Sequence, residues 1–294
     1  MTVTKIPKLP VWKTIADVYI VTARHLGDLI RIAWPWLVLL IALSAALYAA
    51  YYDTERAATT GGTSSSMLWI LTLTASTIIG ALIAVPWHRS ILLGEHQTLS
   101  HGLALDSRKF AYVAKAVAII ASLLLPLVAV TRTGSAEPES DAGTKAISEF
   151  SLADFWPVLF FLLFFALIFA LNRLSLILPA TAVDNRDATL RTAWRATRGN
   201  TLRLAFVSVV ATFLPCLFPL GLGYLLAPAA IAALDANTAP NVIAFAVANT
   251  INEFLTILFG MLFVTFLSLA YRHFFGTAHV DASGTIPPDQ PDAS

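Results

Sequence analysis

The sequence predicts an all-α polytopic membrane protein with six transmembrane helices, and three observations support this prediction. First, 57% of the 294 residues are hydrophobic and only 13% are charged, which is more apolar than a soluble domain requires. Second, the apolar residues form runs close to the roughly 20 residues that cross a bilayer as a helix. Third, basic residues crowd every second connection between these runs, as the positive-inside rule predicts for a multi-pass protein.

The six predicted spans begin and end near polar or basic residues. They cover residues 31–52, 67–86, 111–131, 155–172, 202–221 and 254–271. Of the 19 Lys and Arg residues, only Arg56, Arg132 and Lys145 fall in the connections on one side of the membrane. We therefore expect both termini in the cytoplasm.

The segments outside the spans differ in composition. Residues 1–276 form a single membrane domain, in which the acidic connection 132–154 is predicted to be a flexible extracytoplasmic loop. The polar, proline-bearing tail 277–294 is predicted to be disordered. Residues 224–252 are apolar but interrupted by prolines, so they form either an extracytoplasmic helical hairpin or a re-entrant piece.

A tetrad of a basic residue, an apolar residue, alanine and an aromatic residue occurs three times, at residues 31–34, 109–112 and 203–206. Gly27-Asp28 and Gly199-Asn200 precede two of the tetrads at the same offset. The chain is then three repeated units, each an interfacial helix followed by a transmembrane hairpin. The alternative is that basic and aromatic residues simply mark membrane interfaces, as they do in many proteins.

The stretch before the fifth span concentrates arginines. Asp187 is predicted to cap a helix that runs to Arg198, and Arg191, Arg195 and Arg198 form one stripe along it. With Trp194 on the adjacent face, such a helix lies in the headgroup plane. Either the arginines bind anionic phospholipids, or they only hold this connection in the cytoplasm during insertion.

Two pieces around this helix form a pattern: RLSLILPA from Arg173, and AWRATRGNTLR, which ends at Arg203. They resemble the membrane domain attached to some bacterial glycerophosphodiester phosphodiesterases, and related stand-alone six-helix inner-membrane proteins. The sequence departs from that family at Ala196, where a leucine is more common. The resemblance implies an inner-membrane protein of poorly defined role, without the phosphodiesterase reaction, which belongs to a separate soluble barrel. The candidate lipid- or phosphate-binding residues are Arg173, Arg191, Trp194, Arg195, Arg198 and Arg203.

Other polar residues suggest no enzyme, cofactor or metal site. His88, Glu95, His96 and His101 share a connection, but their spacing matches no compact ligand motif, and His88 is predicted at the interface. Glu253 is predicted at the outer edge of the last span. Asn172 is predicted to cap the fourth span, and the single cysteine excludes an internal disulfide. A net charge of +1 predicts no nucleic-acid partner.

These observations predict a non-catalytic inner-membrane protein that engages anionic phospholipids through cytoplasmic interfacial helices. A role in envelope homeostasis or as a scaffold, with protein subunits or a second copy as partners, accompanies this prediction. The alternative is a transporter or channel for a small or lipidic substrate. The prolines and glycines of PCLFPLGLG, from Pro215, are the best candidates for a kinked or discontinuous helix.

Overall fold

The computed structural model describes residues 7–57, 64–134, 156–185, 187–232 and 242–276. Regular structure in these ranges is helical, with no strand. The long helices are α2 (Leu26–Ala57), α3 (Ser64–Leu93), α5 (Ser107–Gly134), α6 (Trp156–Leu174), α10 (Leu214–Ala232) and α11 (Val242–Phe275). The shorter ones are α1 (Val11–Arg24), α4 (Leu99–Leu103), α7 (Ile177–Ala182), α8 (Leu190–Ala196) and α9 (Thr201–Ser208).

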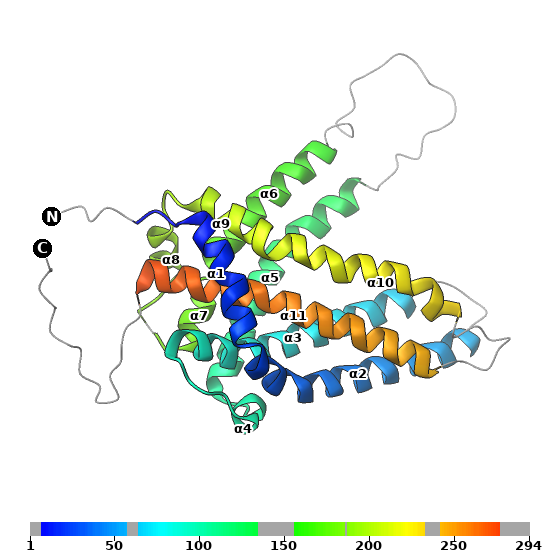
Figure 1. Ribbon diagram of the computed structural model, residues 1–294. Helices are drawn as coiled ribbons and strands as arrows, with labels where there is room; N and C mark the ends of the chain where they lie inside the picture. Colours follow the sequence, from blue (N-terminus) through cyan, green and yellow to red (C-terminus); the bar gives the residue numbers. More distant parts are fainter. Residues whose placement is uncertain (1–6, 58–63, 135–155, 186, 233–241, 277–294) are drawn as a thin grey trace, which may run out of the picture.

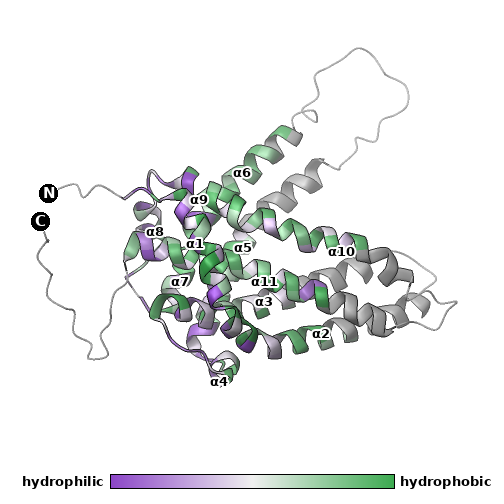
Figure 2. Ribbon diagram, viewed as in Figure 1, coloured by the Kyte–Doolittle hydropathy of each residue, from purple (hydrophilic) through white to green (hydrophobic). Residues whose placement is uncertain are grey.

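The long helices form a bundle with one splayed pair. Helices α2, α3, α10 and α11 run alongside one another, while α5 and α6 contact each other and diverge from the rest (Figure 1). The short helices gather at one end of the bundle, where the hydrophilic residues concentrate (Figure 2). We call this end the polar end. Helix α1 packs against α11 and α9 there.

Five helical segments in the described residues are long and apolar enough to cross a membrane. They are Leu26–Leu43, Thr74–Leu93, Phe161–Ala182, Thr201–Leu225 and Ile251–Phe275. The chain therefore has the organisation of an all-α membrane protein with several spans. The remaining predicted span, 111–131, lies within α5, which is not among these five. The count of six spans stays a prediction.

The structure assigns the irregular segment 224–252 to the flanking helices where it is described. Residues up to Ala232 continue α10, and α11 begins at Val242. These parts belong to two long helices and not to a separate re-entrant element. Residues 135–154 of the predicted loop, residues 233–241 and the tail 277–294 lie outside the described residues; Arg132 is still in α5.

The backbone is irregular just before Pro215, at the start of the segment predicted to be kinked or discontinuous. A π-helical segment, Val209–Phe213, joins α9 to α10, and α10 itself continues through Pro215 and Pro219. A proline has no N–H to donate to the carbonyl four residues earlier, so Pro215 leaves the backbone of this preceding turn free to widen. Single π-helical turns of this kind are common within α-helices.

The three tetrads differ in burial. In the first and third, Ile32 and Leu204 are fully buried, whereas the aromatic Trp34 and Phe206 are exposed. In the middle tetrad the aromatic residue, Tyr112, is buried. The outer two copies therefore present the same faces, and the middle copy is turned differently. The threefold repeat stays a prediction.

Candidate functional site

Helix α8 carries the arginine stripe, but its boundaries differ from the predicted ones. Its cap is Thr189, not Asp187: Thr189 Oγ1 accepts from the Thr192 backbone N–H at 3.2 Å, and Thr192 Oγ1 accepts from the Thr189 N–H at 2.7 Å. This reciprocal pair satisfies two N–H groups at the start of the helix. The helix ends at Ala196 instead of Arg198. The backbone N–H of Asp187 donates to Asn185 Oδ1 in the preceding turn.

The three stripe arginines point to the surroundings of the protein. Arg191, Arg195 and Arg198 are exposed, and their side chains make no hydrogen bond or ion pair with any described residue. Leu190 and Trp194 beside them are about half exposed. Helix α8 therefore presents free cations next to an apolar and aromatic face at the polar end of the molecule.

Arg173 and Trp194, by contrast, are engaged with each other. The guanidinium carbon of Arg173 lies 3.5 Å from the centroid of the Trp194 ring. Its Nε donates to Thr197 Oγ1 at 2.9 Å, and its Nη2 donates to the Trp194 carbonyl. A planar guanidinium suits both stacking and this fork of acceptors. Arg173 thus fastens the end of α6 to α8.

Asn200 and Arg203, the last residues of the motif, bind a segment near the start of the chain. Asn200 accepts from the Leu9 N–H through Oδ1 at 2.9 Å and donates through Nδ2 to the Pro7 carbonyl at 3.1 Å. Arg203 Nη1 donates to the Leu9 carbonyl at 2.9 Å. We call these contacts the N-terminal clamp. Nothing in the sequence signals this pairing, because the residues are more than 190 positions apart.

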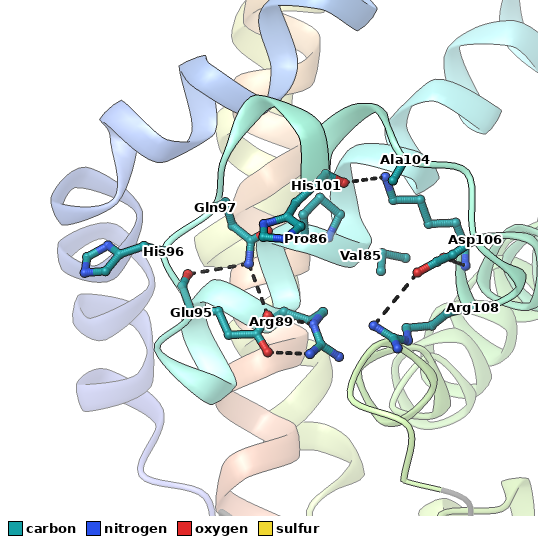
Figure 3. Close-up of a pocket in the computed structure, with 11 residues that line it drawn as sticks. Val85, Pro86, Arg89, Glu95, His96, Gln97, His101, Ala104, Asp106 and Arg108 are labelled. Carbon is teal, nitrogen blue, oxygen red and sulfur yellow. Dashed lines mark hydrogen bonds and ion pairs between the residues drawn. The ribbon is translucent and has the colours of Figure 1, made fainter. Parts of the chain in front are cut away.

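A polar pocket of about 420 Å³ lies between the end of α3, α4 and the start of α5 (Figure 3). On one wall Arg89 forms a bidentate pair with Glu95, with Nε and Oε2 2.8 Å apart. Burial raises the pKa of Glu95, but the hydrogen bonds and charge of Arg89, with Gln97 and Arg108, lower it overall. On the opposite wall, Arg108 faces Asp106.

Lys109 is a buried residue that lines this pocket. Its side chain is 3% exposed, and its ammonium donates to the carbonyls of His101 at 2.9 Å and Gly102 at 2.6 Å. Burial lowers the pKa of Lys109, while the charge of Asp106 opposes that effect. Lysine therefore ties α5 to the last residues of α4, and the cations of the pocket are largely committed to internal partners.

His88 is fully buried between helices. Its Nδ1 lies 2.7 Å from Ser268 Oγ on α11, and its Nε2 lies 3.0 Å from Tyr112 OH on α5. Ser268 Oγ donates to the Val264 carbonyl, so Nδ1 is the donor to Ser268 and Nε2 accepts from Tyr112. The serine proton is thus directed away from the imidazole. This arrangement binds three helices together and does not activate a nucleophile.

Two other predicted residues lie within helices. Glu253 is buried in α11, which begins at Val242, and it lies close to the start of the candidate span Ile251–Phe275. Asn172 does not cap its helix: Nδ2 donates to the Ile168 carbonyl within α6, at 2.9 Å, and Oδ1 is buried without a partner. Among the described residues no group of three His, Cys, Asp or Glu side chains is placed to hold a metal. His96, next to Glu95 in the sequence, lines the rim of the polar pocket and is itself exposed (Figure 3).

Comparison with known proteins gives this chain no relative: no family model, no curated protein and no solved structure matches it.

Proposed function

We propose that the protein is a non-catalytic, multi-pass protein of the bacterial inner membrane that engages anionic phospholipid headgroups through α8. The observation that carries this proposal is the exposure of Arg191, Arg195 and Arg198 without internal partners, next to exposed Leu190 and Trp194. Arginines beside apolar and aromatic side chains favour a position in the headgroup plane. Each basic residue near an anionic surface contributes about 1 kcal/mol.

Exposed aromatic residues at the same end support this position. Trp12 is 73% exposed and meets Phe206 edge to face, with 5.9 Å between the ring centroids. Trp34 and Leu202 are also exposed. Amphipathic aromatic rings concentrate at membrane interfaces. The polar end would then lie at the level of the headgroups, with the long helices crossing the hydrocarbon.

An even number of spans with both termini in the cytoplasm is part of the proposal. Helix α1, near the N-terminus, packs against the last helix, α11, and residues Lys13 and Arg272 line the same cavity. The first and last described segments therefore lie on one side of the bundle, which agrees with six crossings. The basic connections predict that this side is cytoplasmic.

The resemblance to the phosphodiesterase-associated membrane domain supports only part of the proposal. Arg173, Trp194, Thr197, Asn200 and Arg203, which carry the motif, make contacts inside the protein. Such contacts favour a structural role for the motif. Arg191, Arg195 and Arg198 are then the residues that contact lipid. A scaffold role, with protein subunits or a second copy as partners, fits this division.

The experiment that tests lipid engagement is native mass spectrometry of protein released gently from its own membrane. The Arg191/Arg195/Arg198→Ala variant should retain clearly less anionic phospholipid than the wild type, because roughly 1 kcal/mol is lost per arginine. The Lys8/Arg24/Arg31→Ala variant removes the same charge elsewhere at the polar end and should retain lipid. Equal amounts of retained anionic phospholipid in the wild type and the α8 variant would contradict the proposal. The arginines would then serve only to orient the chain in the membrane.

A transporter or channel, the alternative from the sequence, gains no support from the polar residues of the described spans. Thr212 donates to the Ser208 carbonyl, Thr265 to the Met261 carbonyl and Ser268 to the Val264 carbonyl. These hydroxyls serve their own helices or the buried contacts between helices.

A further inference from the structure

A second cavity opens at the polar end, between α1 and the last turns of α11. Its volume is about 350 Å³. It is lined from α1 by Lys13, Thr14 and Asp17, with Pro10 before them, and from α11 by Leu269, Arg272 and His273. The volume is near the lower end of small-molecule sites. A ligand that fills it would be small.

The side chains around this cavity carry unused positive charge. The side chains of Lys13 and Arg272 are exposed and form no hydrogen bond or ion pair with a described residue. Asp17, one turn after Lys13 on α1, does not approach it within ion-pair distance. His273 also lines the cavity, but its Nε2 is shielded from solvent and has no hydrogen-bond partner. Two free cationic side chains therefore line one small space.

The start of α1 adds to the positive potential. Pro10 offers no side-chain cap, and the first turn contains no acidic residue. The first intrahelical bond runs from the Thr14 N–H to the Pro10 carbonyl at 2.9 Å, so the preceding N–H groups have no acceptor within the helix. Unneutralised helix N-termini favour anions. This effect supports the charges of Lys13 and Arg272, which lie beside it.

We propose that this cavity binds a phosphate group, presented either by a small soluble phosphate or by the headgroup of a phosphomonoester lipid. The side chains of Lys13 and Arg272 would contact the phosphate oxygens. Thr14 Oγ1 donates to the Pro10 carbonyl at 2.8 Å, so it offers only an acceptor. Asp17 can accept the hydrogen of a singly protonated phosphate, and Leu269 forms the apolar floor. The site is independent of the lipid contacts proposed for α8.

The first arm of the test measures soluble phosphate. Full-length protein in phosphatidylcholine nanodiscs is titrated calorimetrically with inorganic phosphate, and separately with glycerol 3-phosphate, at constant ionic strength. Lys13→Gln/Arg272→Gln should weaken binding at least about tenfold, as expected when charge-assisted hydrogen bonds are lost. Lys13→Arg/Arg272→Lys keeps both charges and should retain binding. Arg24→Gln, on α1 but outside the cavity, should bind like the wild type.

The second arm identifies the source of the phosphate. Native mass spectrometry counts phosphatidic acid retained from nanodiscs that contain it, in the wild type and in Lys13→Gln/Arg272→Gln. Loss of retained lipid without soluble binding assigns the cavity to a headgroup, and soluble binding assigns it to a free phosphate. Matching helical circular dichroism shows that the variant is folded. The proposal is overturned when neither form binds, or when the double glutamine variant binds both as the wild type does.

The Arg191/Arg195/Arg198→Ala variant separates this inference from the proposed function. It should leave phosphate binding in the cavity intact. If this variant retains as much lipid as the wild type, and phosphate binding still requires Lys13 and Arg272, only the proposed function is rejected.

Discussion

Arginines of the same region of this chain have different surroundings. Arg173 lies over the Trp194 ring and donates to Thr197, whereas Arg191 is exposed and has no partner among the described residues. The first is held by geometry that only a planar guanidinium supplies. The second contributes charge alone. A change from arginine to lysine should distinguish the two roles.

We expect Arg173→Lys to lower the free energy of unfolding by about 1 kcal/mol, because the ring stacking and the bond to Thr197 are lost while the charge remains. The matched change, Arg191→Lys, should leave stability unchanged. Thermal unfolding in a mild detergent, followed by circular dichroism, measures both. Similar melting temperatures for the two variants would contradict the role assigned to Arg173.

The motif residues make internal contacts that the sequence did not predict. Arg173, Trp194 and Arg203 stand out in the sequence because of their motif, and the sequence offers lipid as their common target. Their actual contacts include Thr197 and Leu9. A contact between residues 9 and 203 depends on how α1 packs against α9, which hydropathy and helical spacing do not encode.

At the scale of the helices, one buried imidazole connects three of them. His88 on α3 bonds to Ser268 on α11 and to Tyr112 on α5. Next to it, the Trp87 indole donates to Thr265 at 2.9 Å. Polar side chains hidden between transmembrane helices give packing a specific register, since lipid offers them no alternative partner.

Replacing His88 with leucine leaves the Ser268 and Tyr112 hydroxyls without their partner. We expect His88→Leu to destabilise the fold by about 2–3 kcal/mol, since each buried, unsatisfied polar group costs roughly 1–3 kcal/mol. The control is His96→Leu, because His96 is exposed. The measurement is the midpoint of thermal unfolding in detergent. A His88→Leu protein as stable as this control would show that the three-helix contact is not stabilising.

The long helices were predictable as elements because each contains an apolar run of membrane length. Their ends were not. Helix α11 begins at Val242, before Asn249 and Asn252, and polar residues of this kind lie beyond the hydrophobic signal used to place the span. The cap of α8 was missed for a similar reason: Asp187 is the stronger capping residue by type, but the backbone turns at Asn185 and the helix starts after Thr189.

For the molecule as a whole, orientation is the property that can be tested most directly. In a Cys216→Ala background, we expect Ser140→Cys, in the predicted 132–154 loop, to react with a membrane-impermeant maleimide in intact cells. Leu105→Cys, in the exposed connection before α5, should react only after the cells are permeabilised. Labelling of Leu105→Cys but not Ser140→Cys in intact cells would invert the proposed topology.

Composition was enough to predict an all-α membrane protein. It did not predict that one pair of helices diverges from the others. The divergence of α5 and α6 from the other long helices (Figure 1) was not predicted from the apolar runs, which indicate where helices lie but not how they pack. The middle tetrad, where Tyr112 is buried, belongs to this divergent pair. Differences in packing between similar units depend on how their side chains fit together. A repeated sequence pattern does not specify that fit.

The N-terminal clamp also sets an order of events during biosynthesis. Leu9 leaves the ribosome 191 residues before Asn200, the residue that binds it. At the usual translation speed of 5–20 residues per second, this interval lasts roughly 10–40 s. Throughout that time the first residues of the chain have no clamp to occupy. Leu9 can dock only after Asn200 and Arg203 have been synthesised, so the clamp is a late contact in the assembly of the fold.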